Sequence, residues 1–81
     1  MNLNYRLLQY CKANIEDWGF LERRALKMID HMRCPLQMAS PELANKMEEK
    51  ITEYLEDNKI DGENLGIDID EVFWASEDLP A

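Results

Sequence analysis

The chain is poor in the features that most enzymes and membrane proteins need. Only three of its 81 residues are glycines, and they form no glycine-rich loop that could cradle a phosphate. It has one histidine, and neither its cysteines nor its serines have a recognisable activating neighbour, so we expect no enzymatic activity. Its uncharged apolar runs extend over only a few residues, which excludes a membrane-spanning segment.

Cysteine is also scarce. We expect the two cysteines, Cys11 and Cys34, to be free thiols in a reducing compartment, and a disulfide between them is the alternative. The stretch from Met1 to Arg6 has no basic region followed by an apolar one, so we expect no secretory signal. Together these features predict a cytoplasmic protein that does not associate with a membrane.

Basic residues are few, and their distribution along the chain is uneven. Residues 1–33 carry six lysines and arginines against four carboxylates, a net charge of +2. Residues 34–81 carry three lysines against thirteen carboxylates, a net charge of −10. This asymmetry argues against a nucleic-acid ligand, and it favours a basic partner.

The clearest secondary-structure signal is a helix over residues 41–57. Ser40 can cap the first turn, Pro41 suits the first helical position, and Glu42 favours the positive end of the helix dipole. Apolar residues then recur at helical spacing, namely Leu43, Met47, Ile51, Tyr54 and Leu55. Asn58 or the pair Asp61-Gly62 would end this helix.

The first 33 residues predict two helices, about 3–13 and 16–33, packed as a hairpin. A single long helix is the alternative, but Gly19 inside it would cost about 1 kcal/mol relative to alanine. Asn14 or Asp17 could cap the second helix, and Pro35 would end it. Its buried stripe is predicted to comprise Trp18, Leu21, Ala25, Met28, Ile29 and Met32.

The C-terminal part of the chain is ambiguous. Apolar residues alternate with glycine and aspartate over 65–70, which is a strand pattern, and Asp61-Gly62 could form a hairpin turn. Residues 70–75 could equally form a short helix. We predict a mainly α fold, a small three-helix bundle of a hairpin and one long helix over residues 1–60. Residues 61–81 would be an acidic C-terminal extension of the same single domain, on or near the bundle.

Two metal-binding patterns deserve mention, and both are incomplete. Residues 57–68 match a calcium loop at Asp57, Asp61 and Gly62, but Lys59 occupies a ligand position and Asp68 replaces the usual glutamate. Cys11, His31 and Cys34 would give a zinc ion three ligands without a fourth. We therefore predict no metal site and no cofactor.

Acidic and aromatic residues come together in the C-terminal extension, where aromatic side chains could anchor a basic partner and carboxylates could steer it. The predicted contact residues are Asp68, Asp70, Glu71, Phe73 and Trp74, with Glu49, Glu53 and Glu56 as steering charges. The competing interpretation is that Val72, Phe73 and Trp74 fold back as a lid on the helical core. The sequence thus predicts a non-enzymatic adaptor, regulator or inhibitor that binds a basic protein surface.

Two other functions stay open. The near-heptad spacing of apolar residues from Leu8 to Met32 is compatible with a self-associating helical protein, a homo-oligomer. A helix, a short connection and the helix that begins at Pro41 also resemble a helix-turn-helix DNA binder in outline. The helix that begins at Pro41 carries more carboxylates than basic residues, which argues against contacts with DNA phosphates.

Overall fold

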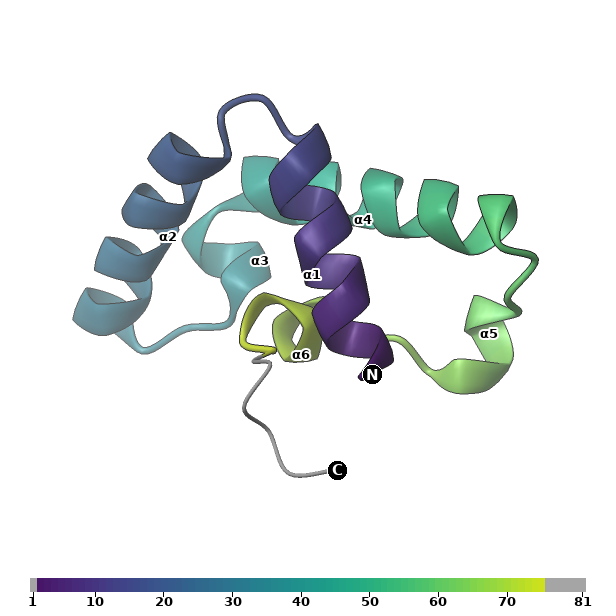
Figure 1. Ribbon diagram of the computed structural model, residues 1–81. Helices are drawn as coiled ribbons and strands as arrows, with labels where there is room; N and C mark the ends of the chain where they lie inside the picture. The colour runs from purple at the N-terminus through teal and green to yellow at the C-terminus, as the bar shows by residue number, and fades with distance from the viewer. Residues whose placement is uncertain (1, 76–81) are drawn as a thin grey trace.

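A computed structural model describes residues 2–75, and these form six helices and no strand (Figure 1). The mainly α fold predicted from the sequence is therefore confirmed. The three long helices are α1 (Leu3–Asn14), α2 (Trp18–Met32) and α4 (Pro41–Asp57). The short ones are α3 (Leu36–Ala39), α5 (Gly62–Leu65) and α6 (Ile69–Phe73).

Helix α4 is the central element of the bundle. Helices α1, α2, α3 and α6 all pack against it, and α1 crosses it in Figure 1. The hairpin predicted for the first two helices is open, because the main packing partners of α1 are α4 and α6, whereas α2 packs on α3 and α4. The short α3 lies in the connection between α2 and α4 and packs against both.

Local signals set the ends of the long helices. The Ser40 hydroxyl accepts a hydrogen bond from the Leu43 amide (3.2 Å), so α4 begins where its capping residue and proline predict. The break between α1 and α2 falls at residues 15–17. Asp17 occupies the capping position of α2 without a side-chain hydrogen bond to its first turn. At the other end of α2, Arg33 adopts the left-handed conformation before Pro35.

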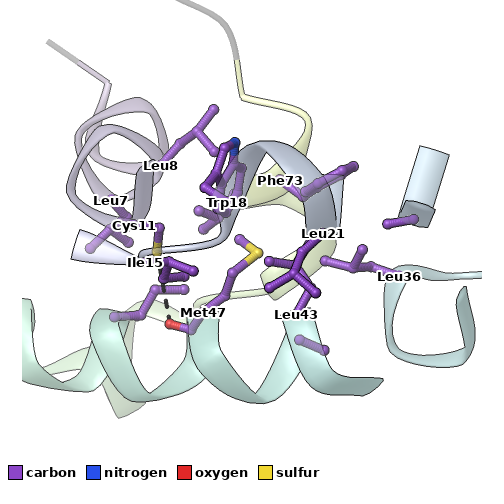
Figure 2. Close-up of a cluster of buried hydrophobic side chains, with 14 of the residues drawn as sticks. Leu7, Leu8, Cys11, Ile15, Trp18, Leu21, Leu36, Leu43, Met47 and Phe73 are labelled. Atoms are coloured by element: carbon purple, nitrogen blue, oxygen red, sulfur yellow. Dashed lines mark hydrogen bonds between the residues drawn. The ribbon is translucent and has the colours of Figure 1, made fainter. Parts of the chain in front are cut away.

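The core lies between α4 and the helices that cover it (Figure 2). The largest fully enclosed side chains are those of Leu7, Cys11, Leu36, Leu43, Met47 and Val72. The Cys11 thiol donates to the Met47 carbonyl oxygen (3.9 Å), which fixes α1 against α4. Because the core also contains Val72 and Phe73, the C-terminal extension is part of the same packed unit up to α6.

The buried stripe predicted for α2 is only partly enclosed. Trp18, Leu21 and Ala25 are buried, but Met28 is 40% exposed and Met32 is 59% exposed. All of these residues lie on one side of the helix. Its second half extends beyond the surface that α3 and α4 offer, so the apolar stripe continues into solvent.

The alternation over residues 65–70 does not produce a strand. The chain instead forms α5 and α6, and the aspartates before these helices accept hydrogen bonds from their first turns. A lone strand would leave its backbone groups without partners, whereas the two caps satisfy them locally. The carboxylates at positions 77 and 78, which belong to the predicted acidic extension, lie outside the described residues.

Candidate protein-binding groove

An open hollow of about 1050 Å³ lies between the C-terminal half of α4, α5 and the segment that enters α6. We call it the acidic groove. Its apolar lining consists of Ile51, Leu55, Ile60, Ile67 and Ile69. Its acidic lining consists of Glu48, Glu56, Asp61, Glu63, Asp68 and Asp70. None of the described residues that line the groove is basic, so nothing in the lining neutralises these carboxylates.

Helix α4 supplies one wall through its periodicity. Glu48, Ile51, Thr52, Leu55 and Glu56 are spaced so that they share one face of the helix. Helix α1 packs on the neighbouring face of α4, where it donates hydrogen bonds to Glu53 and Tyr54, which do not line the groove. Helix α4 therefore presents two carboxylates to the groove, and Ile51 and Leu55, which belong to the buried core, form the base of the groove.

The opposite wall depends on a compact turn after α4. The Asp61 carboxylate accepts hydrogen bonds from the amides of Glu63 (3.2 Å) and Asn64 (3.4 Å), which begins α5. Gly62 lies so close to α4 that a Cβ atom there would be 2.6 Å from a Leu55 methyl carbon. Gly66 ends α5 in the left-handed conformation (φ +60°), which glycine adopts without strain. These contacts turn the chain so that the start of α5 lies against the C-terminal end of α4.

Two of the predicted contact residues, Asp68 and Asp70, line the groove and also hold its wall in place. Asp68 accepts a hydrogen bond from the Asp70 amide (2.9 Å) and so caps α6. The half-buried Asp70 accepts a hydrogen bond from the Leu36 amide (2.9 Å), the first amide of α3. Pro35 has no side-chain acceptor for that amide, so α6 supplies the cap of α3 from the other end of the chain.

The predicted steering charges lie along one side of α4, at spacings of four and three residues, but they meet different neighbours. Glu56 lines the acidic groove. Glu53 points toward α1, where it accepts hydrogen bonds from the Tyr10 hydroxyl (2.6 Å) and the Lys50 ammonium (3.4 Å). The hydrogen bond to Glu53 is the main cause that raises the pKa of Tyr10 to about 12, and it also lowers the pKa of Glu53. Glu49 is exposed and lies with Lys50 beside a separate, smaller hollow.

The predicted aromatic anchors also separate. Phe73 is 7% exposed and packs near Trp18, with 6.2 Å between the ring centroids, and Val72 is fully buried. Both residues are therefore the lid that the competing interpretation described, and a partner could reach Phe73 only by opening the core. Trp74 is 55% exposed and meets Phe73 edge to face (4.9 Å), while Glu71 is exposed.

The apolar lining of the groove and three of its acidic residues, Glu48, Asp61 and Glu63, were not among the contact residues predicted from the sequence. A signal was present for one of them, because Glu48 and Glu56 are two helical turns apart on α4 and share a face. The sequence contained no such signal for Asp61 and Glu63, because their position depends on how the chain turns after α4. The alternating isoleucines at 67 and 69 were visible as a pattern, but a strand interpretation conceals that they face the groove.

Three other features bear on function. Residues 2–75 contain no group of three or more His, Cys, Asp and Glu side chains placed to hold a metal ion. Among the same residues, no helix has the length and apolar character to cross a membrane. Helix α4, the recognition helix of the DNA-binding alternative, has one face against the bundle and another in the acidic groove.

Comparisons with models of protein families, with curated proteins and with solved structures find no match for this chain.

Proposed function

We propose that this protein is a non-enzymatic interaction module that binds a basic, amphipathic segment of another protein in the acidic groove. The observation that supports this most strongly is the combination of five apolar and six acidic side chains in one open groove without a basic residue in its lining. A partner segment with lysines or arginines beside large apolar residues would match both components. As an adaptor, regulator or inhibitor, the protein would act in the cytoplasm, which its two free cysteines favour.

The two components have different physical roles. Apolar side chains of the partner that leave water against the half-buried Ile60, Ile67 and Ile69 would supply affinity, about 25 cal/mol for each Å² of apolar area buried. The carboxylates would raise the rate of encounter and select basic over acidic segments. Since these carboxylates are mostly exposed, salt would weaken their contribution.

The shape of the groove favours a peptide segment over a small molecule. Pockets for small molecules enclose most of their ligand, with only a few polar groups among apolar ones. This groove is open to solvent, and all of its charged side chains are acidic. An amphipathic helix laid along α4 would place its apolar face on the isoleucines and its basic residues beside the acidic rim.

The direct test is binding of a fluorescently labelled helical peptide of leucine and lysine, with a leucine–glutamate peptide of the same pattern as the control. The variant Glu48→Lys/Glu56→Lys reverses two groove charges. The variant Glu49→Lys/Asp57→Lys is its matched control, because it makes the same charge change on α4 at the same spacing and alters no residue of the groove lining.

Fluorescence anisotropy should show that the wild type and the Glu49/Asp57 variant bind the basic peptide with similar Kd. The Glu48/Glu56 variant should bind it about tenfold more weakly, which corresponds to about 1.4 kcal/mol. If both variants lose affinity equally, the interaction depends on net charge alone, and the groove is not the site. Equal binding of the acidic and basic peptides would also overturn the proposal.

A further inference from the structure

Helix α2 has an exposed face with a composition complementary to that of the acidic groove. We call it the α2 outer face, and it comprises Phe20, Arg24, Lys27, Met28, His31 and Met32. Phe20, Arg24, Lys27 and His31 lie on the side of the helix away from the core, and Met28 and Met32 lie beside them where the apolar stripe becomes exposed. Three of them are apolar, and none is acidic.

The apolar members of the α2 outer face are well exposed. Phe20 is 55% exposed and Met32 is 59% exposed, while Met28 is 40% exposed. The Arg24 guanidinium lies 5.5 Å from the centroid of the Phe20 ring, so a basic group and the aromatic ring form one unit. Large apolar side chains grouped on one face of a helix are typical of an interaction surface.

We propose that the α2 outer face of one copy binds in the acidic groove of a second copy. This inference rests on the proposed function, because it assigns a particular occupant to the same groove. Phe20, Met28 and Met32 would contact the isoleucines of the groove. Arg24 and Lys27 would lie beside its carboxylates. The described chain thus contains a helix with the same chemistry that the groove would select in a partner.

A molecule cannot fill its own groove with this helix. In Figure 1, α2 lies at one end of the molecule, and α5, which forms one wall of the groove, lies at the other. The contact must therefore join different surfaces of two copies, so each copy has one groove and one α2 outer face to offer. Such a head-to-tail contact produces a ring if its rotation closes and a growing chain if it does not.

Sedimentation velocity over a concentration series, from about 10 μM to about 1 mM, covers the Kd range of a weak interface. The wild type should show a sedimentation coefficient that rises with concentration. The variants Glu48→Lys/Glu56→Lys and Arg24→Glu/Lys27→Glu should each be monomeric, since each lacks one half of the contact. The Glu49→Lys/Asp57→Lys variant should associate like the wild type. Circular dichroism melts of every variant first establish that it is folded.

Mixing gives the sharpest result. The Arg24/Lys27 variant keeps an intact groove, and the Glu48/Glu56 variant keeps an intact α2 outer face, so together they restore the contact that each lacks alone. The two reversed surfaces also carry opposite charges, so an equimolar mixture should form dimers or larger assemblies, although each variant alone is monomeric. A mixture that stays monomeric would overturn the inference.

The remaining outcomes separate this inference from the proposed function. If the wild type is monomeric at all concentrations but binds the leucine–lysine peptide in the groove, self-association is wrong and the proposed function stands. If the Glu48/Glu56 variant associates as strongly as the wild type, the copies meet elsewhere and the inference is overturned. If neither copies nor peptide bind, both proposals fail.

Discussion

The hydrogen bond from the Leu36 amide to Asp70 joins the last helix of the described chain to the middle of the sequence. Replacing Asp70 with alanine removes the acceptor and leaves the first amide of α3 without a partner in a half-buried place. Leaving a buried donor unpaired costs about 1–3 kcal/mol, and bonds to a charged acceptor lie in the upper part of the usual range. We expect Asp70→Ala to lower the free energy of unfolding by about 2 kcal/mol.

Such a loss is large for a domain of this size. A decrease of 1 kcal/mol lowers Tm by about 4–8 °C in domains of 60–100 residues, so Asp70→Ala should lower Tm by about 10 °C. Asp70→Asn keeps an acceptor oxygen and loses only the charge, and its cost should be about 1 kcal/mol or less. Glu71→Ala is the matched control, because the neighbouring carboxylate is exposed, and its removal should change stability by less than about 0.5 kcal/mol.

Urea denaturation followed by tryptophan fluorescence and by circular dichroism measures these differences. The expected order of stability is wild type and Glu71→Ala together, then Asp70→Asn, then Asp70→Ala. If Asp70→Ala is as stable as Glu71→Ala, the carboxylate does not hold α6 on α3. Only the buried side chains of Val72 and Phe73 would then hold α6 in the packed unit.

Three further predictions concern the lid, a tyrosine and the thiols. Val72→Ala should lower the free energy of unfolding by about 2 kcal/mol because the side chain is fully buried, and Trp74→Ala should change it by less than about 0.5 kcal/mol; equal losses in urea denaturation would contradict the lid. The Tyr10 pKa, raised from 10.0 to about 12 chiefly by a hydrogen bond to an α4 carboxylate, gives stability that is fully present below about pH 10 and is lost as pH rises through about 12. Denaturation measured across this pH range should show that Tyr10→Phe lacks this loss of stability at high pH. If Tyr10→Phe has the same pH profile of stability as the wild type, the prediction is refuted. Burial raises the pKa of the Cys11 thiol to about 11, so a short iodoacetamide pulse at neutral pH should modify Cys34 alone, and mass spectrometry that finds equal labelling would contradict the core assignment.

The long helices could be predicted because their signals are local. Ser40 and Pro41 specify a helix start through the bonds they make or cannot make, whatever the rest of the chain does. The break before α2 was placed within a few residues, although Asp17 makes no capping hydrogen bond and Gly19 lies inside the helix. The extent of burial along α2 could not be predicted from the sequence. Met32 has the same position in the helical repeat as buried residues, but it lies beyond the part of α2 that α3 and α4 cover.

The groove was harder to foresee because it is formed by the return of the chain after α4. Asp68 was predicted as a contact residue, but no feature of the sequence brings it near Glu48, twenty residues earlier. The alternation that includes Ile67 and Ile69 predicts a strand as readily as the helical turns that the aspartate caps stabilise. The aspartate caps and the burial of Val72 and Phe73 together favour the helices, and the helices set the position of one wall of the groove.

The central claim is that the acidic groove binds a basic amphipathic helix, and the most direct measurement is to locate that helix. Amide chemical shifts of isotope-labelled protein, recorded during a titration with the leucine–lysine peptide, report contact residue by residue. We predict that the changes concentrate at Ile51, Leu55 and residues 66–70, which line the groove. Shift changes concentrated instead around Glu49 would contradict the account. So would the lack of a saturable change up to about 1 mM peptide, because a Kd of 1 mM corresponds to a binding free energy of only about −4.1 kcal/mol.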